Sequence, residues 1–325
     1  MKYIRLGSRD PYVNLAIEEF LLRETKEDVF MLWQNDPTVV IGKNQNAYAE
    51  VDLAYAEAHG IRVARRLSGG GAVYHDSGNI NYTFITFEGE GKDFSYFTRP
   101  IIEALATLGV PIVQNGRNDL ECEGRKISGN ARYTANGRIL HHGTLLFDAD
   151  VGTISSVLCT DPEKFKHKAV KSHAARVGAL AAYLGDGMTA TALMDHIERY
   201  VLSKTGASVS MPPSDEQISA LRARNASREW ILSDRRYLTE YTVSRKRKYP
   251  FGLVRADLTL WGQRIESIRI SGDFFACAPI EDLEEKLVGQ SIDAPLAVCP
   301  ETYIADFTAE MLLSLLAGEE TNEKA

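Results

Sequence analysis

Apolar residues recur along the chain at two spacings, and these spacings predict its helices and strands. Asp10 and Pro11 are typical of a helix start, and apolar side chains follow from Val13 to Leu21 at the i, i+3, i+4 spacing of one buried stripe. Similar spacing predicts helices over 52–59, 94–108, 280–287 and 308–316. Short apolar runs predict strands over 29–33, 38–41, 62–65, 72–74, 81–86, 121–127, 138–147, 253–260 and 264–270.

The connections between these segments are short and indicate antiparallel pairing. Asn35-Asp36-Pro37 predicts a turn between two strands, and Asn136-Gly137 is a hairpin signal. No repeated strand–helix–strand rhythm is present, which argues against a doubly wound parallel sheet. The pattern therefore predicts an α+β fold.

A run of charged residues suggests a domain boundary near position 245. Ser244-Arg245-Lys246-Arg247-Lys248 precedes Tyr249-Pro250, and we interpret this run as an exposed linker. We expect one domain over 1–244 and a small α+β domain over 245–325, free to move relative to one another.

Composition narrows the classes of function. The formal net charge of −7 over 325 residues argues against a dedicated nucleic-acid binder. The four cysteines, Cys122, Cys159, Cys277 and Cys299, have no CxxC spacing and indicate reduced thiols in the cytoplasm. No stretch of 18 apolar residues occurs and the N-terminus has no apolar leader region, so we expect neither a membrane span nor secretion.

A glycine-rich loop is the first candidate for chemistry. Ser68-Gly69-Gly70-Gly71 follows Arg65-Arg66, and consecutive glycines let backbone N–H groups approach an anion. An adjacent arginine can neutralise phosphate or carboxylate charge. The loop is not a Walker A motif, because no Gly-Lys-Ser/Thr follows it. The alternative is a flexible loop beside a solvated arginine.

Two further segments carry polar residues suited to catalysis. Lys126 could stabilise a reacting phosphate and acyl oxygen, and Asp119 could hold Mg²⁺, although a solvated lysine and a turn aspartate are the simpler interpretations. On a strand, His141 and His142 would face opposite sides, so they would rarely bind one metal ion. Gly185–Ala190 fits the dinucleotide pattern G-x-G-x-x-A but follows a helical stretch, and we interpret it as a loop.

Taken together, these segments resemble the lipoate–protein ligase family, and the resemblance covers almost the whole chain. Six motifs occur in family order, and the tail resembles the family's accessory domain through Ser271–Phe275. The motifs are 14–19, 38–46, 65–79, 116–120, 126–131 and 142–146. The stretch 168–180 departs from the family pattern, with the usual glycine and asparagine replaced.

The resemblance implies a fold, a reaction and residue roles. The fold is a catalytic domain like those of biotin ligases and class II aminoacyl-tRNA synthetases, with a mixed, largely antiparallel sheet. The reaction uses ATP and Mg²⁺ to convert lipoate to lipoyl-AMP and then acylates a carrier lysine. The implied ATP-binding residues are Arg66, Gly71, Ala72, Val73, Tyr74 and Lys126, with Lys126 also catalytic. The implied lipoyl-binding residues are Gly42, Gly69, Gly70, His75, Asn79, Asn118, Lys126 and His142, with Asp119 at the metal.

The resemblance also implies protein partners. These are apo-lipoyl domains of 2-oxoacid dehydrogenase E2 subunits, the glycine cleavage H protein, or both, and neither nucleic acid nor a membrane is expected. Because such carriers are commonly acidic, we expect the basic segment with Lys164, Lys166, Lys168 and Lys171 to help dock them.

Three alternatives remain at this point. An octanoyl or lipoyl transferase of the same superfamily would use a cysteine thiolate, and Cys122 lies just after Asn118-Asp119-Leu120. A variant ligase would accept preformed lipoyl nucleotide, and a non-catalytic lipoate-binding protein would only bind or dock. The retention of Arg66 and Lys126 favours the ligase.

Overall fold

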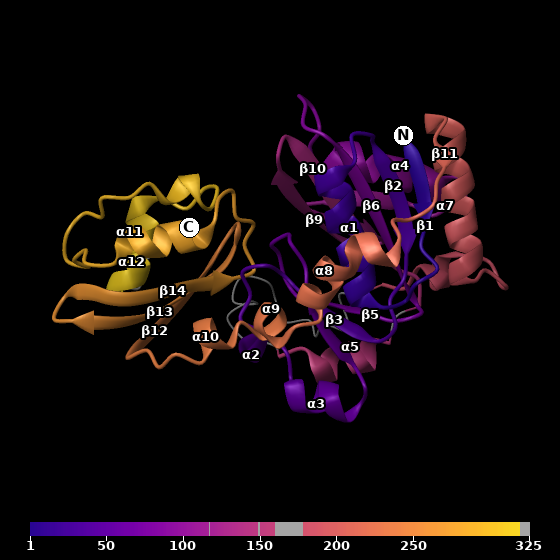
Figure 1. Cartoon of the computed structure of the whole chain (residues 1–325). Coiled ribbons are helices and arrows are strands. Elements are labelled where there is room, and N and C mark those ends of the chain that lie inside the picture. Colours follow the sequence, from indigo (N-terminus) through magenta and orange to yellow (C-terminus); the bar gives the residue numbers. More distant parts are fainter. Residues whose placement is uncertain (117, 149, 160–177, 319–325) are drawn as a thin grey trace.

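The chain folds into a larger N-terminal unit and a smaller C-terminal unit that contact one another (Figure 1). This computed structural model describes residues 1–116, 118–148, 150–159 and 178–318. Each unit has a hydrophobic core of its own. Across these residues, we find no helix long and apolar enough to cross a membrane.

An eight-stranded sheet forms the centre of the described N-terminal unit. In spatial order its strands are β11 (Ser208–Val209), β1 (Lys2–Arg5), β2 (Val29–Trp33), β6 (Asn79–Phe87), β10 (Arg138–Leu146), β9 (Arg125–Ala135), β8 (Asp119–Cys122) and β7 (Ile112–Asn115). The first three strands pair in parallel, and the pairings from β2 onward are antiparallel. The prediction of a mixed, largely antiparallel sheet is therefore confirmed.

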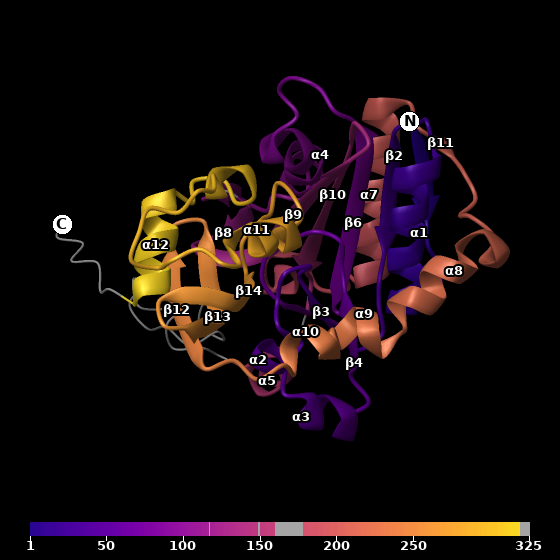
Figure 2. The same ribbon diagram turned by 60° about the vertical axis from the view of Figure 1, so that its left-hand side comes forward.

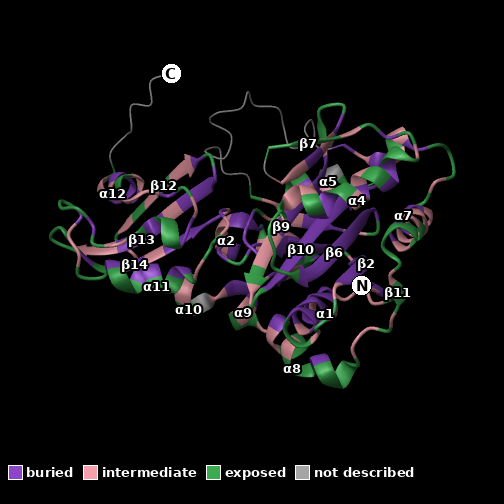
Figure 3. Cartoon of the chain, turned by 90° about the horizontal axis from the view of Figure 1, so that it is seen from above, coloured by how far each residue is buried: buried purple, intermediate pink, exposed green. Residues whose placement is uncertain are grey.

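Helices cover both faces of this sheet, so its strands are buried on both sides. Along β2, Phe30 and Leu32 enter the core beneath α4 and α7, whereas Met31 and Trp33 enter the core beneath α1 and α8. Figure 3 shows the buried central strands between α1 and α4. These helices are α1 (Pro11–Glu24), α4 (Phe94–Ala106), α7 (Ala190–Thr205) and α8 (Asp215–Asn225).

A second, smaller sheet lies next to the first and brings the glycine-rich loop toward it. Its order is β4 (Arg62–Arg65), β3 (Thr38–Ile41), β5 (Val73–His75). The turn predicted at 35–37 does not join a hairpin, because β2 and β3 belong to different sheets. Both strands are fully buried, so their polarity pattern does not identify their pairing partners. Short helices complete the unit, namely α2 (Ala47–Glu50), α3 (Leu53–Ala58), α5 (Val151–Val157), η2 (Leu180–Tyr183), α9 (Arg228–Leu232) and α10 (Asp234–Tyr237).

The predicted strand over 121–127 is wrong in one respect. It is two strands, β8 and β9, joined at Glu123 and Gly124, whose φ angles are 49° and 75°. Left-handed backbone at two successive residues makes a tight hairpin turn. By contrast, the turn predicted at Asn136-Gly137 does join β9 to β10, with φ angles of 53° and 69°.

The C-terminal unit is a three-stranded antiparallel sheet with helices packed on it, as Figure 2 shows from the side. Its elements are β12 (Val243–Tyr249), β13 (Gly252–Trp261), β14 (Arg264–Gly272), α11 (Ile280–Leu287), η3 (Pro300–Thr302) and α12 (Ala309–Ala317). The charged run at 244–248 is therefore not a linker but most of strand β12. Its charged side chains lie on a strand at the edge of the sheet, a position where charge is well tolerated.

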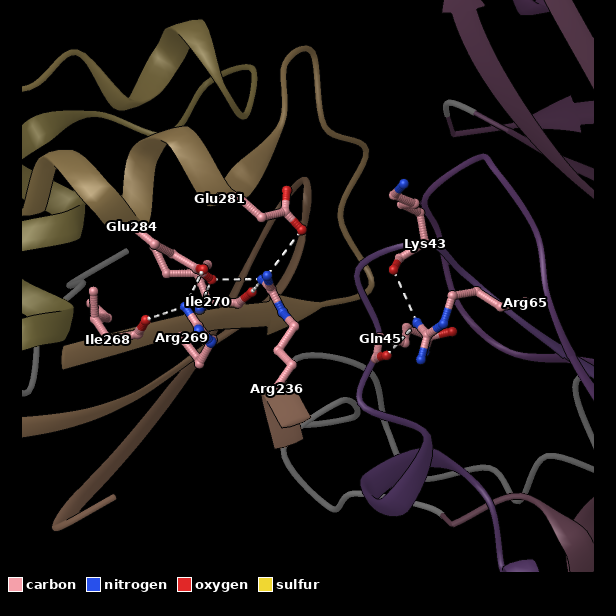
Figure 4. Close-up of polar contacts among 9 residues, drawn as sticks. All are labelled: Lys43, Gln45, Arg65, Arg236, Ile268, Arg269, Ile270, Glu281 and Glu284. Atoms are coloured by element: carbon pink, nitrogen blue, oxygen red, sulfur yellow. Dashed lines mark hydrogen bonds and ion pairs between the residues drawn. The ribbon is translucent and has the colours of Figure 1, made fainter. Parts of the chain in front are cut away.

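Two short helices connect the units, and each is tied to a different one. Ser233 separates α9 from α10 and has left-handed backbone, with φ 53°. On the N-terminal side, Arg65 donates hydrogen bonds to the carbonyls of Trp230 and Ile231. On the C-terminal side, Arg236 bonds Glu281 and Glu284 of α11 (Figure 4).

Glu284 is buried and holds the connection together, which gives a first prediction. Its carboxylate accepts from Arg236 at 2.6 Å, from Arg269 at 2.9 Å and from the Ile270 N–H at 2.7 Å. We expect Glu284→Ala to cost on the order of 3 kcal/mol, because it removes the buried carboxylate that Arg236 and Arg269 share. Glu285→Ala, an exposed neighbour, is the matched control. Urea unfolding of both variants measures the effect, and equal midpoints would contradict it.

Candidate active site

A cavity of about 120 Å³ opens between the two sheets of the N-terminal unit. Nine of the residues expected at the site line it, which places segments far apart in the sequence around one space. They are Arg66, Gly70, Gly71, Ala72, Val73, His75, Asn118, Lys126 and His142. The sheets therefore bring together the three segments that carry candidate chemistry.

The Arg66 guanidinium holds the glycine-rich loop from the inside. It donates to the carbonyls of Gly69 at 2.7 Å and Gly71 at 2.8 Å, to the Val40 carbonyl at 3.0 Å and to the Ser68 hydroxyl at 3.0 Å. Burial lowers the pKa of Arg66 to about 10, which leaves it charged at neutral pH. In this conformation Arg66 shapes the loop, rather than sitting solvated beside it.

Gly42 and Gly69 are expected site residues that do not line the cavity but are required by close packing. A Cβ at Gly42 would collide with the carbonyl oxygen of Gly70, and one at Gly69 would collide with the carbonyl oxygen of Phe274. Gly42 thus supports the loop from behind, and Gly69 is the point where the C-terminal unit touches it. The Gly70 N–H donates to the Phe274 carbonyl at 3.2 Å.

Strand alternation decides which residues of β5 reach the cavity. Val73 and His75 face it, whereas Tyr74 packs into the core on the other side with Val39 and Ile41. Burial raises the pKa of Tyr74 to about 12. Only the backbone of Tyr74 is therefore in a position to face a nucleotide.

His75 lines the cavity and carries its hydrogen on Nε2. Asn35 donates to its Nδ1 at 3.0 Å, which assigns the hydrogen to Nε2. Burial lowers the pKa of His75 to about 3, so the ring is neutral. Nε2 is buried and has no hydrogen-bond partner in the described part of the chain.

Lys126 and Asp119 form an ion pair across strands β8 and β9. The Lys126 Nζ lies 2.9 Å from Asp119 Oδ1, and both side chains are about one-third exposed. Asp119 itself does not line the cavity, so Lys126 is the member of the pair that does. Across the residues placed by the structure, no group of three or more His, Cys, Asp or Glu side chains forms a metal site.

Asn118 fixes the position of β9 at the cavity. It donates to the Asn130 carbonyl at 2.8 Å, and the Asn130 N–H donates back to the Asn118 carbonyl at 2.9 Å. The Asn130 side chain in turn accepts from the Tyr82 hydroxyl and bonds His141 Nε2. Asn79, another expected site residue, bonds Asn81 and lies outside the cavity wall.

His141 and His142 face opposite sides of β10, as the strand pattern predicts. His141 stacks on Phe97 at 4.8 Å between ring centroids, within the core under α4. His142 faces the cavity and contacts Ser68 at 2.7 Å. The pair therefore does not bind one metal ion, and His142 is the histidine that can act on a ligand.

Several further lining residues were not assigned a role from the sequence, although all but Trp33 and Asn81 lie within the motifs that carry the family resemblance. They are Leu15, Trp33, Val40, Asn81, Gly129, Asn130, Ala131, Gly143 and Thr144. Gly143 is a further packing glycine, since a Cβ there would collide with Asn130 and Tyr82. Leu15 and Trp33 look like core residues in the sequence, because the wall of a pocket and a filled core have the same apolar pattern.

The structure describes Cys122 but not the basic segment that was expected to dock a carrier. Cys122 is buried in the core with Leu120 and Ile127, does not line the cavity, and has its thiol pKa raised by burial. A thiolate nucleophile needs the opposite environment. Lys164, Lys166, Lys168 and Lys171 lie outside the described residues, as does most of the departing stretch 168–180.

Comparisons with known proteins agree with this geometry. Residues 10–202 match the family model "Lipoyl protein ligase A/B catalytic domain", and residues 239–316 match "Bacterial lipoate protein ligase C-terminus". The chain is 35% identical to lipoate-protein ligase LplJ of Bacillus subtilis, over 94% of this chain and 97% of that protein.

Solved structures show the same fold. The structure of P. falciparum LipL1 in complex with lipoate superposes with a TM-score of 0.76 at 22% identity, covering 90% of this chain and 91% of that one. A lipoate-protein ligase A bound with ATP gives 0.57 at 24% identity, covering 74% and 96%. The chain therefore belongs to the lipoate–protein ligase family.

Proposed function

We propose that the cavity activates lipoate with ATP and then transfers the lipoyl group to a lysine of a carrier protein. The observation that carries this proposal is the convergence of Lys126, the Gly70–Gly71 backbone and an apolar wall on one cavity. The apolar wall of Leu15, Trp33 and Val40 suits an acyl chain, and the polar groups suit phosphate and carboxylate oxygens.

The first step forms an acyl-phosphate bond. A carboxylate oxygen of lipoate attacks the α-phosphorus of ATP, and the bond to the leaving pyrophosphate breaks, which gives lipoyl-AMP. No protein nucleophile is needed, so the chain's task is positioning and charge neutralisation. Lys126 and the glycine-loop N–H groups supply positive potential there, and His75 Nε2–H supplies a further donor.

The second step forms the amide. The amine of a carrier lysine attacks the acyl carbon of lipoyl-AMP, the bond to AMP breaks, and a proton leaves the nitrogen. Lys126 stabilises the oxyanion that develops on the acyl oxygen. The family name describes a protein acceptor, and we propose apo-lipoyl domains of 2-oxoacid dehydrogenases, the glycine cleavage H protein, or both, with the basic 164–171 segment helping to dock them.

Magnesium fits this site as a companion of ATP rather than as a resident ion. Mg²⁺ commonly takes one or two carboxylates plus phosphate oxygens. Asp119 pairs with Lys126, which lines the cavity, and we propose it as the protein ligand. Bound there, the ion would supply charge neutralisation for the triphosphate.

We propose that the predicted units 1–244 and 245–325 move relative to one another during the cycle. The hinge would lie near Ser233, because β12 crosses residue 244 and α10 is bonded to α11, so both travel with the C-terminal unit. The Phe274 carbonyl accepts the hydrogen bond of the Gly70 N–H, and Phe275 packs beside Gly70. An anion that binds this N–H must displace that contact. Movement of the C-terminal unit therefore controls one of the donors that the first step uses.

Pyrophosphate release tests the proposal most simply. Wild-type protein with ATP, Mg²⁺ and lipoate should release pyrophosphate, and omission of lipoate should stop the release. Release that is independent of lipoate, or no release at all, would rule out lipoate activation by this chain.

Lys126→Ala should reduce ligation by about 10²–10³, the scale of losing one oxyanion donor. Lys126→Arg should not restore it, because a planar fork replaces a compact ammonium. Arg125→Ala is the control, since Arg125 is exposed and precedes Lys126 on the same strand. Initial rates of lipoyl transfer measure the effect, and wild-type turnover by either Lys126 variant would refute the assignment.

Cys122→Ser should keep most of the ligase activity, because the buried thiol lies outside the cavity. Intact-mass analysis of the protein during turnover should detect no acyl thioester. Circular dichroism checks that the variant folds. Loss of all acyl transfer in a folded variant would instead support the transferase alternative.

Gly69→Ala should separate the two units, because its new Cβ collides with the Phe274 carbonyl. Gly71→Ala is the matched control, since nothing lies within 4 Å of a Cβ there. Small-angle X-ray scattering should show a larger radius of gyration for Gly69→Ala alone. Identical scattering from both variants would mean that this contact does not hold the units together.

A further inference from the structure

A buried carboxylate lies beneath the cavity floor and has no role in the mechanism so far. Glu18 of α1 is 2% exposed, and in the part of the chain that the structure describes it forms no ion pair with lysine or arginine. Its carboxylate contacts His142 Nδ1, with both oxygens at 3.2 Å, and the Thr83 hydroxyl. Burying a carboxylate is costly unless hydrogen bonds stabilise it.

The hydrogen bonds on one side of Glu18 have a single consistent direction. Arg66 Nε can only donate, and it does so to Ser68 Oγ at 3.0 Å. Ser68 Oγ lies 2.7 Å from His142 Nε2, the one acceptor within reach of its hydroxyl among the described residues. The Ser68 hydroxyl therefore donates to Nε2, which places the ring hydrogen of His142 on Nδ1, directed at Glu18.

The hydrogen bonds on the other side point the same way. Trp33 Nε1 can only donate, and it does so to Thr83 Oγ1 at 2.9 Å. The Thr83 hydroxyl is then free to donate to Glu18. Two chains of donors thus end on one carboxylate, and three side chains that line the cavity, Trp33, His142 and Arg66, belong to them.

A carboxylate suits the junction because both of its oxygens accept: Oε1 contacts the Thr83 hydroxyl and His142 Nδ1, and Oε2 contacts Nδ1 as well. An amide that keeps its oxygen on Thr83 would place its NH2 where Oε2 stands. A glutamine at position 18 could donate to His142 Nδ1 and so favour the tautomer with hydrogen on Nε2. His142 and Arg66 would then both donate to Ser68, and the Ser68 hydroxyl hydrogen would have no acceptor among the residues placed by the structure. An unpaired buried donor costs about 1–3 kcal/mol, so the loop would lose this anchor.

The order Ser68, His142, Glu18 is also that of a hydrolase triad, but its surroundings are not. Ser68 is fully buried, already accepts a hydrogen bond from Arg66, and does not line the cavity. An acyl carbon cannot reach its oxygen in this arrangement. The chain therefore orients side chains rather than providing a nucleophile.

We propose that Glu18 is a positioning residue: as the shared acceptor of both chains, it fixes the Nδ1–H tautomer of His142 and thereby holds Ser68, Arg66 and the glycine loop in place for substrate. Its effect on rate rests on the proposed ligase function, whereas its effect on the tautomer does not. Losing such a supporting group typically costs about 10–100-fold in activity.

The test compares Glu18→Gln with Glu19→Gln in the full chain. Glu19 is the adjacent buried carboxylate, but it pairs with Arg23 and Arg224, away from the chains that end on Glu18. ¹⁵N NMR of histidine-labelled protein should show His142 protonated on Nδ1 in the wild type and in Glu19→Gln, and on Nε2 in Glu18→Gln. In kinetics, Glu18→Gln should lower kcat for adenylation about 10–100-fold and leave KM for the carrier unchanged.

Each other outcome overturns the proposal in a defined way. An unchanged tautomer in Glu18→Gln, or a changed tautomer with wild-type kcat, means that Glu18 does not position the loop. If Glu18→Gln fails to fold, Ser68→Ala breaks the chain while keeping the charge; it should keep Nδ1–H and lose kcat to a similar extent, and wild-type kcat would refute the proposal. A wild type without ligase activity would contradict the proposed function, and the tautomer would still decide the role of Glu18.

Discussion

Two buried guanidinium groups at the end of β4 hold the functional part of this protein together. Arg65 and Arg66 are 3% and 6% exposed. Their guanidinium N–H groups donate hydrogen bonds to backbone carbonyls, apart from one bond from Arg66 to the Ser68 hydroxyl. Arg65 fixes the 42–45 turn and α9, as Figure 4 shows for Lys43 and Gln45. Arg66 fixes the glycine loop. Guanidinium suits this task because its five donors lie in one rigid plane.

Through these arginines, the residues around the cavity are in direct contact with the C-terminal unit. The loop that Arg66 shapes is the same loop that the C-terminal unit contacts at Gly69 and Gly70, and the helix that Arg65 holds leads into the connection between the units. In the proposed cycle, an anion that binds the loop and the C-terminal unit compete for the same backbone N–H of Gly70.

Much of the fold followed from the sequence, because strand runs and cap residues report local structure. The helix at Pro11–Glu24 and the alternation of His141 and His142 are examples. The pairing of β3 with β4 and β5 was not accessible, since a fully buried run such as Thr38–Ile41 pairs equally well with any neighbour. The charged run in β12 resembled a linker because edge strands also carry charge.

The candidate site, like the fold, could be predicted only in part from the sequence. The roles of Arg66, Lys126 and His142 were implied by the family resemblance, and the structure places these residues at one cavity. Leu15, Trp33 and Glu18 were not assigned a role. Leu15 and Glu18 fall outside the apolar stripe that predicts α1, and Trp33 lies on a strand that is buried at every position. Only the fold shows that Leu15 and Trp33 face a cavity and that Glu18 contacts His142.

The most direct measurement is the intact mass of a purified apo-lipoyl domain after incubation with this protein, lipoate and MgATP. The account predicts a mass gain of one lipoyl group that requires all three components and disappears when the carrier lysine is replaced by arginine. An unmodified carrier in the presence of folded, ATP-binding protein would contradict it.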